Sequence, residues 1–216
     1  MDAVLFDMDG LLVDSEKIWF QVECEVMERL GGRWGTADQE YLVGGSMTAA
    51  VTHMLKISGA GAHPDDVAAW MLEGMTSRLA DGVEMMPGAA ELLASVRRAG
   101  LRTALVTSSV RPIAQACLKG IGVDNFDHVV TGDDVMRTKP HPEPYLTAAR
   151  LLGVAAARCV ALEDSPNGVT SATAAGCRVV AVPSVLPIPA APGRLVVESL
   201  REIDVDVLRA LAARDS

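Results

Sequence analysis

Two acidic residues separated by one position follow an apolar run at the start of the chain. Ala3-Val4-Leu5-Phe6 is continuously apolar, and Asp7, Asp9 and Gly10 come directly after it. Such a run predicts a strand buried on both faces of a parallel sheet, and ligands bind beyond the carboxyl ends of such strands. Two carboxylates this close repel each other unless a cation or a shared proton compensates. The pair therefore indicates a metal ion together with acid–base or nucleophilic chemistry.

Three further polar clusters follow apolar runs later in the chain. They are Thr107-Ser108-Ser109, Lys139-Pro140 and Glu163-Asp164-Ser165. Together they supply hydroxyl donors, one cation and two more acids. Mg²⁺ prefers oxygen ligands, and a lysine acts as a point charge on a phosphate group. Phosphoryl transfer depends mostly on positioning and charge neutralisation. We therefore expect all four clusters to converge on one edge of a sheet and to serve phosphoryl transfer.

The sequence that positions these clusters alternates between strand and helix patterns, apart from one helical insert. Apolar residues at helical spacing follow Asp14, Ser46 and Pro64, and no strand is expected from Glu16 to about Asp81. From Pro87 onward, helix and strand patterns alternate, which predicts a doubly wound parallel sheet. The expected strands are Leu101–Val106, His128–Thr131, Cys159–Leu162, Arg178–Val182 and Leu195–Val197. The expected helices are Ala89–Ala99, Pro112–Lys119, Pro144–Leu152 and Gly168–Ala175.

Composition and charge restrict the class of protein. The net charge of −9 argues against broad binding to nucleic acid or to an anionic membrane, and no apolar run approaches the length of a membrane span. The chain enters a strand at once, without the pattern of a signal peptide. The four cysteines are scattered, as is typical of a reducing compartment. We expect a cytoplasmic protein that binds neither nucleic acid nor membranes and is a monomer or a weak homo-oligomer.

The four clusters, taken in order, resemble the motifs of the haloacid dehalogenase superfamily. The resemblance is to its capped branch of sugar-phosphate phosphatases and β-phosphoglucomutase-like enzymes. The matching segments are Phe6-Asp7-Met8-Asp9-Gly10-Leu11-Leu12-Val13-Asp14-Ser15-Glu16, Val106-Thr107-Ser108, Lys139-Pro140-His141-Pro142 and Leu162-Glu163-Asp164-Ser165-Pro166-Asn167-Gly168. The resemblance implies an α/β fold with a Rossmann-like core formed by residues 1–14 and 82–216. It also implies that residues 15–81 form an α-helical cap domain that closes over the site.

The resemblance assigns a role to each motif residue. It implies that Asp7 is the nucleophile that forms an aspartyl-phosphate. Asp9 would be the general acid that protonates the leaving oxygen, and then the base that activates water. Thr107 and Ser108 would bind the phosphate, and Lys139 would hold the oxygens of the nucleophile and the phosphoryl group.

The resemblance also implies that the cofactor is Mg²⁺ and that the partner is a small phosphorylated metabolite. The expected metal ligands are Asp7, Asp9 through its backbone carbonyl, and Asp164. Glu163 is expected to be a more distant or an alternate ligand. His53 and His141 have no metal-like partners in sequence and are not expected to bind the ion.

Each motif alone also has a simpler structural interpretation. Asp7 and Asp9, and likewise Thr107-Ser108, resemble turn or helix-capping residues. Lys139 alone resembles a solvated surface lysine, and Glu163-Asp164 resemble partners of a helix dipole. Asn167-Gly168 is interpreted as a turn.

Two positions favour a phosphatase over a phosphomutase. The sugar phosphomutases of this branch carry an arginine near Gly44-Gly45-Ser46-Met47 and a histidine about one helical turn after Ser15. Here those places hold Met47 and Trp19. Because a second phosphate needs cationic donors, these residues favour hydrolysis of a substrate with one phosphate. The alternatives are a phosphomutase of the β-phosphoglucomutase type and, less favoured, a non-catalytic phosphate-binding regulator.

Overall fold

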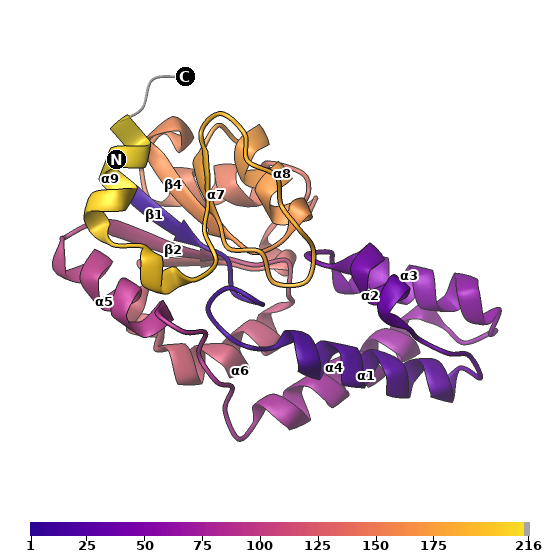
Figure 1. Cartoon of the computed structure of the whole chain (residues 1–216). Coiled ribbons are helices and arrows are strands. Elements are labelled where there is room, and N and C mark those ends of the chain that lie inside the picture. The colour runs from indigo at the N-terminus through magenta and orange to yellow at the C-terminus, as the bar shows by residue number, and fades with distance from the viewer. Residues whose placement is uncertain (214–216) are drawn as a thin grey trace.

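Six parallel strands form one sheet, and the strand that precedes the first acidic pair lies near its centre (Figure 1). The computed structural model describes residues 1–213, so the last three residues of the predicted segment 82–216 lie outside the described residues. The strands are β1 (Ala3–Phe6), β2 (Arg102–Val106), β3 (His128–Val130), β4 (Cys159–Glu163), β5 (Arg178–Ala181) and β6 (Arg194–Val196). Their order is β3-β2-β1-β4-β5-β6, and all neighbours are parallel. The predicted doubly wound α/β fold is confirmed.

The path of the chain across the sheet reverses at β1. The chain first adds β2 and β3 on one side of β1, and it then adds β4, β5 and β6 on the other side. In an open parallel sheet, a crevice forms at the carboxyl ends of the strands where this reversal occurs. The residues that follow β1, β2 and β4 therefore meet at one edge of the sheet.

Both faces of the sheet are covered by helices. All four residues of β1 are fully buried: Val4 and Phe6 belong to one apolar cluster, and Ala3 and Leu5 belong to the other. The first cluster includes residues of α5 (Ala89–Arg98), α6 (Arg111–Ile121) and α9 (Val205–Ala213). The second includes residues of α7 (Glu143–Leu151) and α8 (Pro166–Ala174). This double burial explains why β1 reads as an unbroken apolar run.

Four helices between β1 and α5 pack together beside the sheet (Figure 1). They are α1 (Glu16–Arg29), α2 (Thr36–Leu42), α3 (Met47–Ser58) and α4 (Pro64–Leu79), and residues 16–81, all of them described, contain no strand. Val22, Met54, Met71 and Met75 are among their buried residues. The helical patterns expected after Asp14, Ser46 and Pro64 are thus confirmed. No helix within residues 1–213 is long and apolar enough to cross a membrane.

The sequence patterns missed two helices and misjudged the start of a third. Helix α2 has no buried residue, so it shows no apolar periodicity, whereas α9 carries buried Leu208 and Leu211 at helical spacing and was overlooked. The interpretation of Asn167-Gly168 as a turn is wrong, because both residues lie in the first turn of α8. Ser165 caps this helix by accepting the Gly168 N–H at 3.1 Å. Short 3₁₀ helices span Val123–Asn125, Gly132–Asp134, Ala156–Arg158 and Leu200–Glu202.

Candidate active site

The four polar clusters converge on one cavity at the carboxyl edge of the sheet. Six of the residues singled out from the sequence line it: Asp7, Asp9, Thr107, Ser108, Lys139 and Asp164. The seventh, Glu163, is fully buried and contacts Lys139 instead. The cavity encloses about 700 Å³, including the space at its open mouth. The opposite wall comes from α1, α2, α3 and the loop between α2 and α3.

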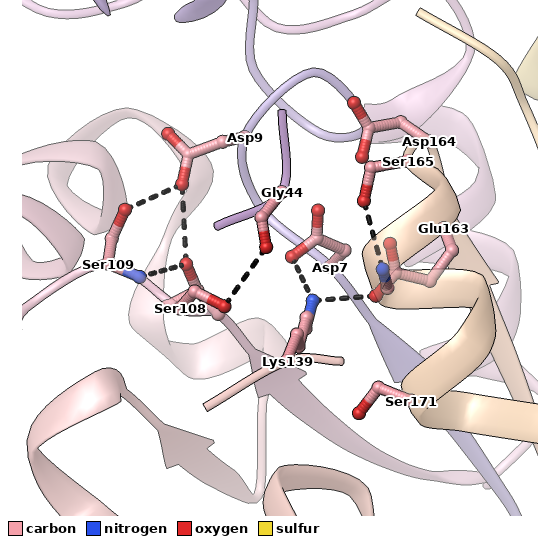
Figure 2. A network of polar contacts seen from close by, with 12 residues as sticks. Asp7, Asp9, Gly44, Ser108, Ser109, Lys139, Glu163, Asp164, Ser165 and Ser171 are labelled. Atoms are coloured by element: carbon pink, nitrogen blue, oxygen red, sulfur yellow. Dashed lines mark hydrogen bonds and ion pairs between the residues drawn. The ribbon is translucent and has the colours of Figure 1, made fainter. Parts of the chain in front are cut away.

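Lys139 bridges two buried carboxylates (Figure 2). Its Nζ lies 2.5 Å from Asp7 Oδ1 and 2.6 Å from Glu163 Oε1, and the Tyr145 hydroxyl donates to the same Glu163 oxygen. Lys139 is only 4% exposed. Burial alone would lower the pKa of Lys139, but the charges of Asp7 and Glu163 together outweigh it and raise the pKa. Lys139 therefore stays charged and fixes one oxygen of Asp7.

Three carboxyl groups crowd the floor of the site. Oxygens of Asp7, Glu163 and Asp164 lie within 4.8 Å of one another, and all three residues are buried. Burial, with the charge of Glu163, raises the pKa of Asp7 to about 7 although Lys139 opposes this. Burial, with the charges of Asp7 and Glu163, also raises the pKa of Asp164 well above its usual value. A divalent cation would relieve this repulsion, and carboxylate oxygens are ligands that Mg²⁺ prefers.

Neighbouring groups leave Asp7 and Asp164 as the acids best placed to hold such a cation. Glu163 Oε1 is occupied by Lys139 and Tyr145, and its buried Oε2 has no hydrogen-bond partner among residues 1–213. Ser184 Oγ donates to Asp164 Oδ2 at 2.5 Å. Gly10 has φ +73°, and a Cβ there would come within 2.2 Å of Asp164 Oδ2. The close approach of the first loop to Asp164 therefore requires glycine at position 10.

Asp9 occupies a different environment, among neutral hydrogen-bond donors. Its Oδ1 accepts from Ser15 Oγ at 2.7 Å and from Trp19 Nε1 at 3.1 Å. Its Oδ2 accepts from Ser109 Oγ at 2.8 Å, as Figure 2 shows, and from Thr107 Oγ1 at 3.3 Å. The Asp9 carboxylate is thus held from both sides, by α1 and by the loop after β2. The Asp9 carboxylate is not part of the cluster formed by Asp7, Glu163 and Asp164. A metal contact of Asp9 through its backbone carbonyl stays a prediction.

The helical segment touches the sheet side of the site through the loop after α2. Asn167 Nδ2 donates to the Val43 carbonyl at 2.8 Å, and Ser108 Oγ donates to the Gly44 carbonyl at 3.4 Å. Gly44 has φ +70°, and a Cβ there would lie 2.2 Å from Ser165 Oγ. The loop therefore packs against the start of α8 more closely than any side chain at position 44 would allow.

Two acids on α1 that the sequence analysis did not single out also line the cavity. Glu23 is buried, and its Oε2 accepts from Trp34 Nε1 at 2.9 Å. Burial raises the pKa of Glu23 to about 8, and burial with the charge of Asp9 raises the pKa of Glu16 to about 7. Their spacing was a usable signal, since residues seven apart share a helix face with Trp19 between them.

The chain is similar to known proteins over most of its length. Residues 4–182 match the family model described as haloacid dehalogenase-like hydrolase. Hexitol phosphatase A of Escherichia coli is 39% identical over 82% of this chain and 81% of its own length. Protein CbbY of Rhodobacter capsulatus is 35% identical over 85% of this chain and 86% of its own.

Solved structures share the fold over nearly the whole chain. CbbY from Rhodobacter sphaeroides in complex with phosphate superposes with a TM-score of 0.82 at 30% identity, covering 94% of this chain and 96% of that one. A β-phosphoglucomutase from Clostridium difficile has a TM-score of 0.87 at 21% identity, covering 98% and 97%, and shows the fold alone. Since the family model spans most of the sequence and its motifs meet at one cavity, the chain belongs to the haloacid dehalogenase-like hydrolase family.

Proposed function

We propose that this protein is an Mg²⁺-dependent phosphatase that hydrolyses a small sugar phosphate or similar metabolite through an aspartyl-phosphate on Asp7. The observation that carries the proposal is the contrast between two acids at one cavity. Asp7 is fixed by Lys139 beside the buried acids, whereas Asp9 is held among four neutral donors. The name of one relative, hexitol phosphatase A, supports such a substrate.

The proposed reaction has two halves. In the first, an Asp7 oxygen attacks phosphorus, the bond to the leaving oxygen breaks, and Asp9 protonates that oxygen. In the second, Asp9 takes a proton from water, the water oxygen attacks phosphorus, and inorganic phosphate leaves Asp7. Thr107 and Ser108 line the cavity and would bind phosphoryl oxygens, Ser108 through its backbone N–H. When bound by Asp7 and Asp164, with Glu163 as an alternate ligand, Mg²⁺ would neutralise charge on the carboxylates and the phosphate.

We also propose that residues 15–81 act as a cap on a core formed by residues 1–14 and 82–216. The helices of this segment supply the far wall of the cavity, and its loop at Val43 and Gly44 bonds to the core. Closing such a segment over bound substrate would exclude water from the first half-reaction. The cytoplasmic location and the monomeric or weakly oligomeric state stay predictions.

The cavity supports a phosphatase more than a phosphomutase. Among the described residues that line it, Lys139 is the single lysine or arginine, and it is already paired with Asp7 and Glu163. Trp19 and Met47 line the cavity where a mutase would place cationic groups. A second phosphate would therefore lack a cationic partner.

The proposal is tested by phosphate release from a panel of phosphorylated metabolites in the presence of Mg²⁺. We expect wild type to hydrolyse sugar monophosphates, EDTA to stop the reaction and Mg²⁺ to restore it. Asp7→Asn should lower the rate by at least about 1,000-fold while the protein stays folded. Asp66→Asn, on an exposed position of α4, is the matched control and should be fully active. Full activity of Asp7→Asn would reject Asp7 as nucleophile, and activity that persists in EDTA would reject the metal.

A further inference from the structure

The wall of the cavity opposite Asp7 is acidic and includes a buried carboxyl group. Glu16 and Glu23 from α1 and Gln39 from α2 lie on this wall. Glu23 is only 7% exposed, and Trp34 satisfies its Oε2. The bond from Trp34 engages one carboxyl oxygen of Glu23 and leaves the other, Oε1, for a partner in the cavity.

The spacing along α1 defines the length of this wall. Glu16 and Glu23 are seven residues apart, which places them on one helix face about 10 Å apart along the axis. Trp19 lies between them, and its indole N–H bonds to Asp9. The leaving oxygen would sit at Asp9 in the proposed reaction. The two carboxyl groups therefore lie along the space that a leaving group of several carbon atoms would occupy.

The charge of the wall restricts what that leaving group can be. Asp9, Glu16 and Glu23 all lie on the cavity, and Lys139 is engaged with Asp7 and Glu163. A second phosphate or a carboxylate would be repelled there. The raised pKa values of Glu16 and Glu23 mean that each is partly protonated near neutral pH. A protonated carboxyl group both donates and accepts hydrogen bonds, as a hydroxyl group does.

We propose that Glu16 and Glu23 form a subsite that binds the hydroxyl groups of an uncharged, polyhydroxylated leaving group. This inference rests on the proposed phosphatase function and narrows its substrate class. The subsite selects sugar or sugar-alcohol monophosphates over sugar bisphosphates. It acts on the part of the substrate remote from phosphorus, so it governs specificity.

The test compares two substrates that share the phosphoryl chemistry and differ in the leaving group. Sorbitol 6-phosphate carries five hydroxyl groups, whereas p-nitrophenyl phosphate carries none. We expect the ratio of their kcat/KM values to fall at least tenfold in Glu16→Leu and in Glu23→Leu. Glu16→Gln and Glu23→Gln should stay within about threefold of wild type, because an amide also donates and accepts. Glu28→Leu, at an exposed position on the same helix, is the matched control and should leave the ratio unchanged.

Each outcome has a defined meaning. An unchanged ratio in both leucine variants would overturn the subsite. So would a wild-type preference for a hexose bisphosphate over sorbitol 6-phosphate, since it would show recognition of a second phosphate. Glu16→Leu keeps the test valid if Glu23→Leu fails to fold, because Glu16 is only half-buried whereas Glu23 is buried and bonded to Trp34. Failure of wild type to hydrolyse either ester would instead reject the proposed phosphatase.

Discussion

At the scale of single residues, two acids separated by only one residue have opposite surroundings. Asp7 lies among buried charges, in contact with Lys139 and close to Glu163 and Asp164. The Asp9 carboxylate instead accepts hydrogen bonds from neutral side chains. Groups with such different environments can divide the work of one reaction, with one attacking phosphorus and the other moving a proton.

Asp9→Asn is predicted to separate the two half-reactions. Only a carboxylate accepts from donors on both sides, so the amide would turn its NH₂ group toward two of them. Hydrolysis of a sugar phosphate should fall about 100- to 10,000-fold, the usual contribution of a general acid–base group. The leaving group of p-nitrophenyl phosphate needs little protonation, so phosphorylation of Asp7 should survive while its hydrolysis slows. Rapid-mixing absorbance should then show a burst near one nitrophenolate per active site.

The control for this prediction is Ser109→Ala, which removes a single donor to Asp9 and keeps the carboxylate. It should slow steady-state hydrolysis much less than Asp9→Asn and should give no burst. A steady-state rate for Asp9→Asn equal to that of wild type would contradict the proposed acid–base role.

At the scale of elements, the start of α8 links the helix to the charged floor of the site. Ser165 caps the helix, Pro166 occupies its first turn, and Gly168 lies directly over the Glu163 carboxylate. Ser-Pro is a helix-start signal that was present in the sequence. The expectation of a turn at Asn167-Gly168 instead placed the start of the helix at Gly168, two residues late. The reason for this glycine is a contact with the preceding strand, which no local pattern reveals.

Gly168→Ala is predicted to destabilise the protein although alanine is the better helix former. Helix propensity alone would favour alanine by about 1 kcal/mol. However, the new Cβ would lie within 2.1 Å of Glu163 carboxylate atoms, which are fully buried and held by Lys139 and Tyr145. Displacing that carboxyl group should cost more, so the free energy of unfolding should fall by about 1–3 kcal/mol in urea titrations.

Gly120→Ala in α6 serves as the matched control. Its Cβ would meet only the Val83 carbonyl oxygen at 3.6 Å, an ordinary contact. Propensity should then decide the result, and the free energy of unfolding should stay the same or rise by up to about 1 kcal/mol. If both variants shifted stability in the same direction by the same amount, the close packing of Gly168 on Glu163 would not be what requires glycine there.

At the scale of the whole molecule, the sheet and the convergence of the motifs were predictable, whereas the placement of the far wall of the cavity against the core was not. Parallel strands bring their carboxyl ends to one edge of the sheet, so a motif that directly follows β1, β2 or β4 must lie at that edge. The wall of Glu16, Glu23 and Gln39 depends on how the helical segment packs against the core. That packing rests on contacts such as Asn167 with Val43, which are remote in sequence and follow no period.

The buried acids should make the stability of the whole protein depend on pH when no metal is present. Burial raises the pKa of Glu23 to about 8, so the folded state holds a proton that the unfolded state releases above its ordinary pKa. The stabilisation from this protonation is complete below the ordinary pKa and is lost as pH rises toward about 8. In EDTA, the free energy of unfolding of wild type should therefore fall as pH rises from 5.5 to 8.

Glu23→Gln isolates the contribution of this one group, because Asp7, Asp164 and Glu16 act in the same direction in both proteins. An amide does not titrate, so the variant should lose stability with pH less steeply, by up to about 1.4 kcal/mol per pH unit. The free energy of unfolding of the variant, relative to that of wild type, should therefore increase toward pH 8. Urea titrations at several pH values measure both slopes, and Glu28→Gln should follow wild type because Glu28 is exposed. Parallel curves for wild type and Glu23→Gln would mean that Glu23 is ionised in the folded protein, and the wall of the cavity would then carry a charge suited to a cation instead of hydroxyl groups.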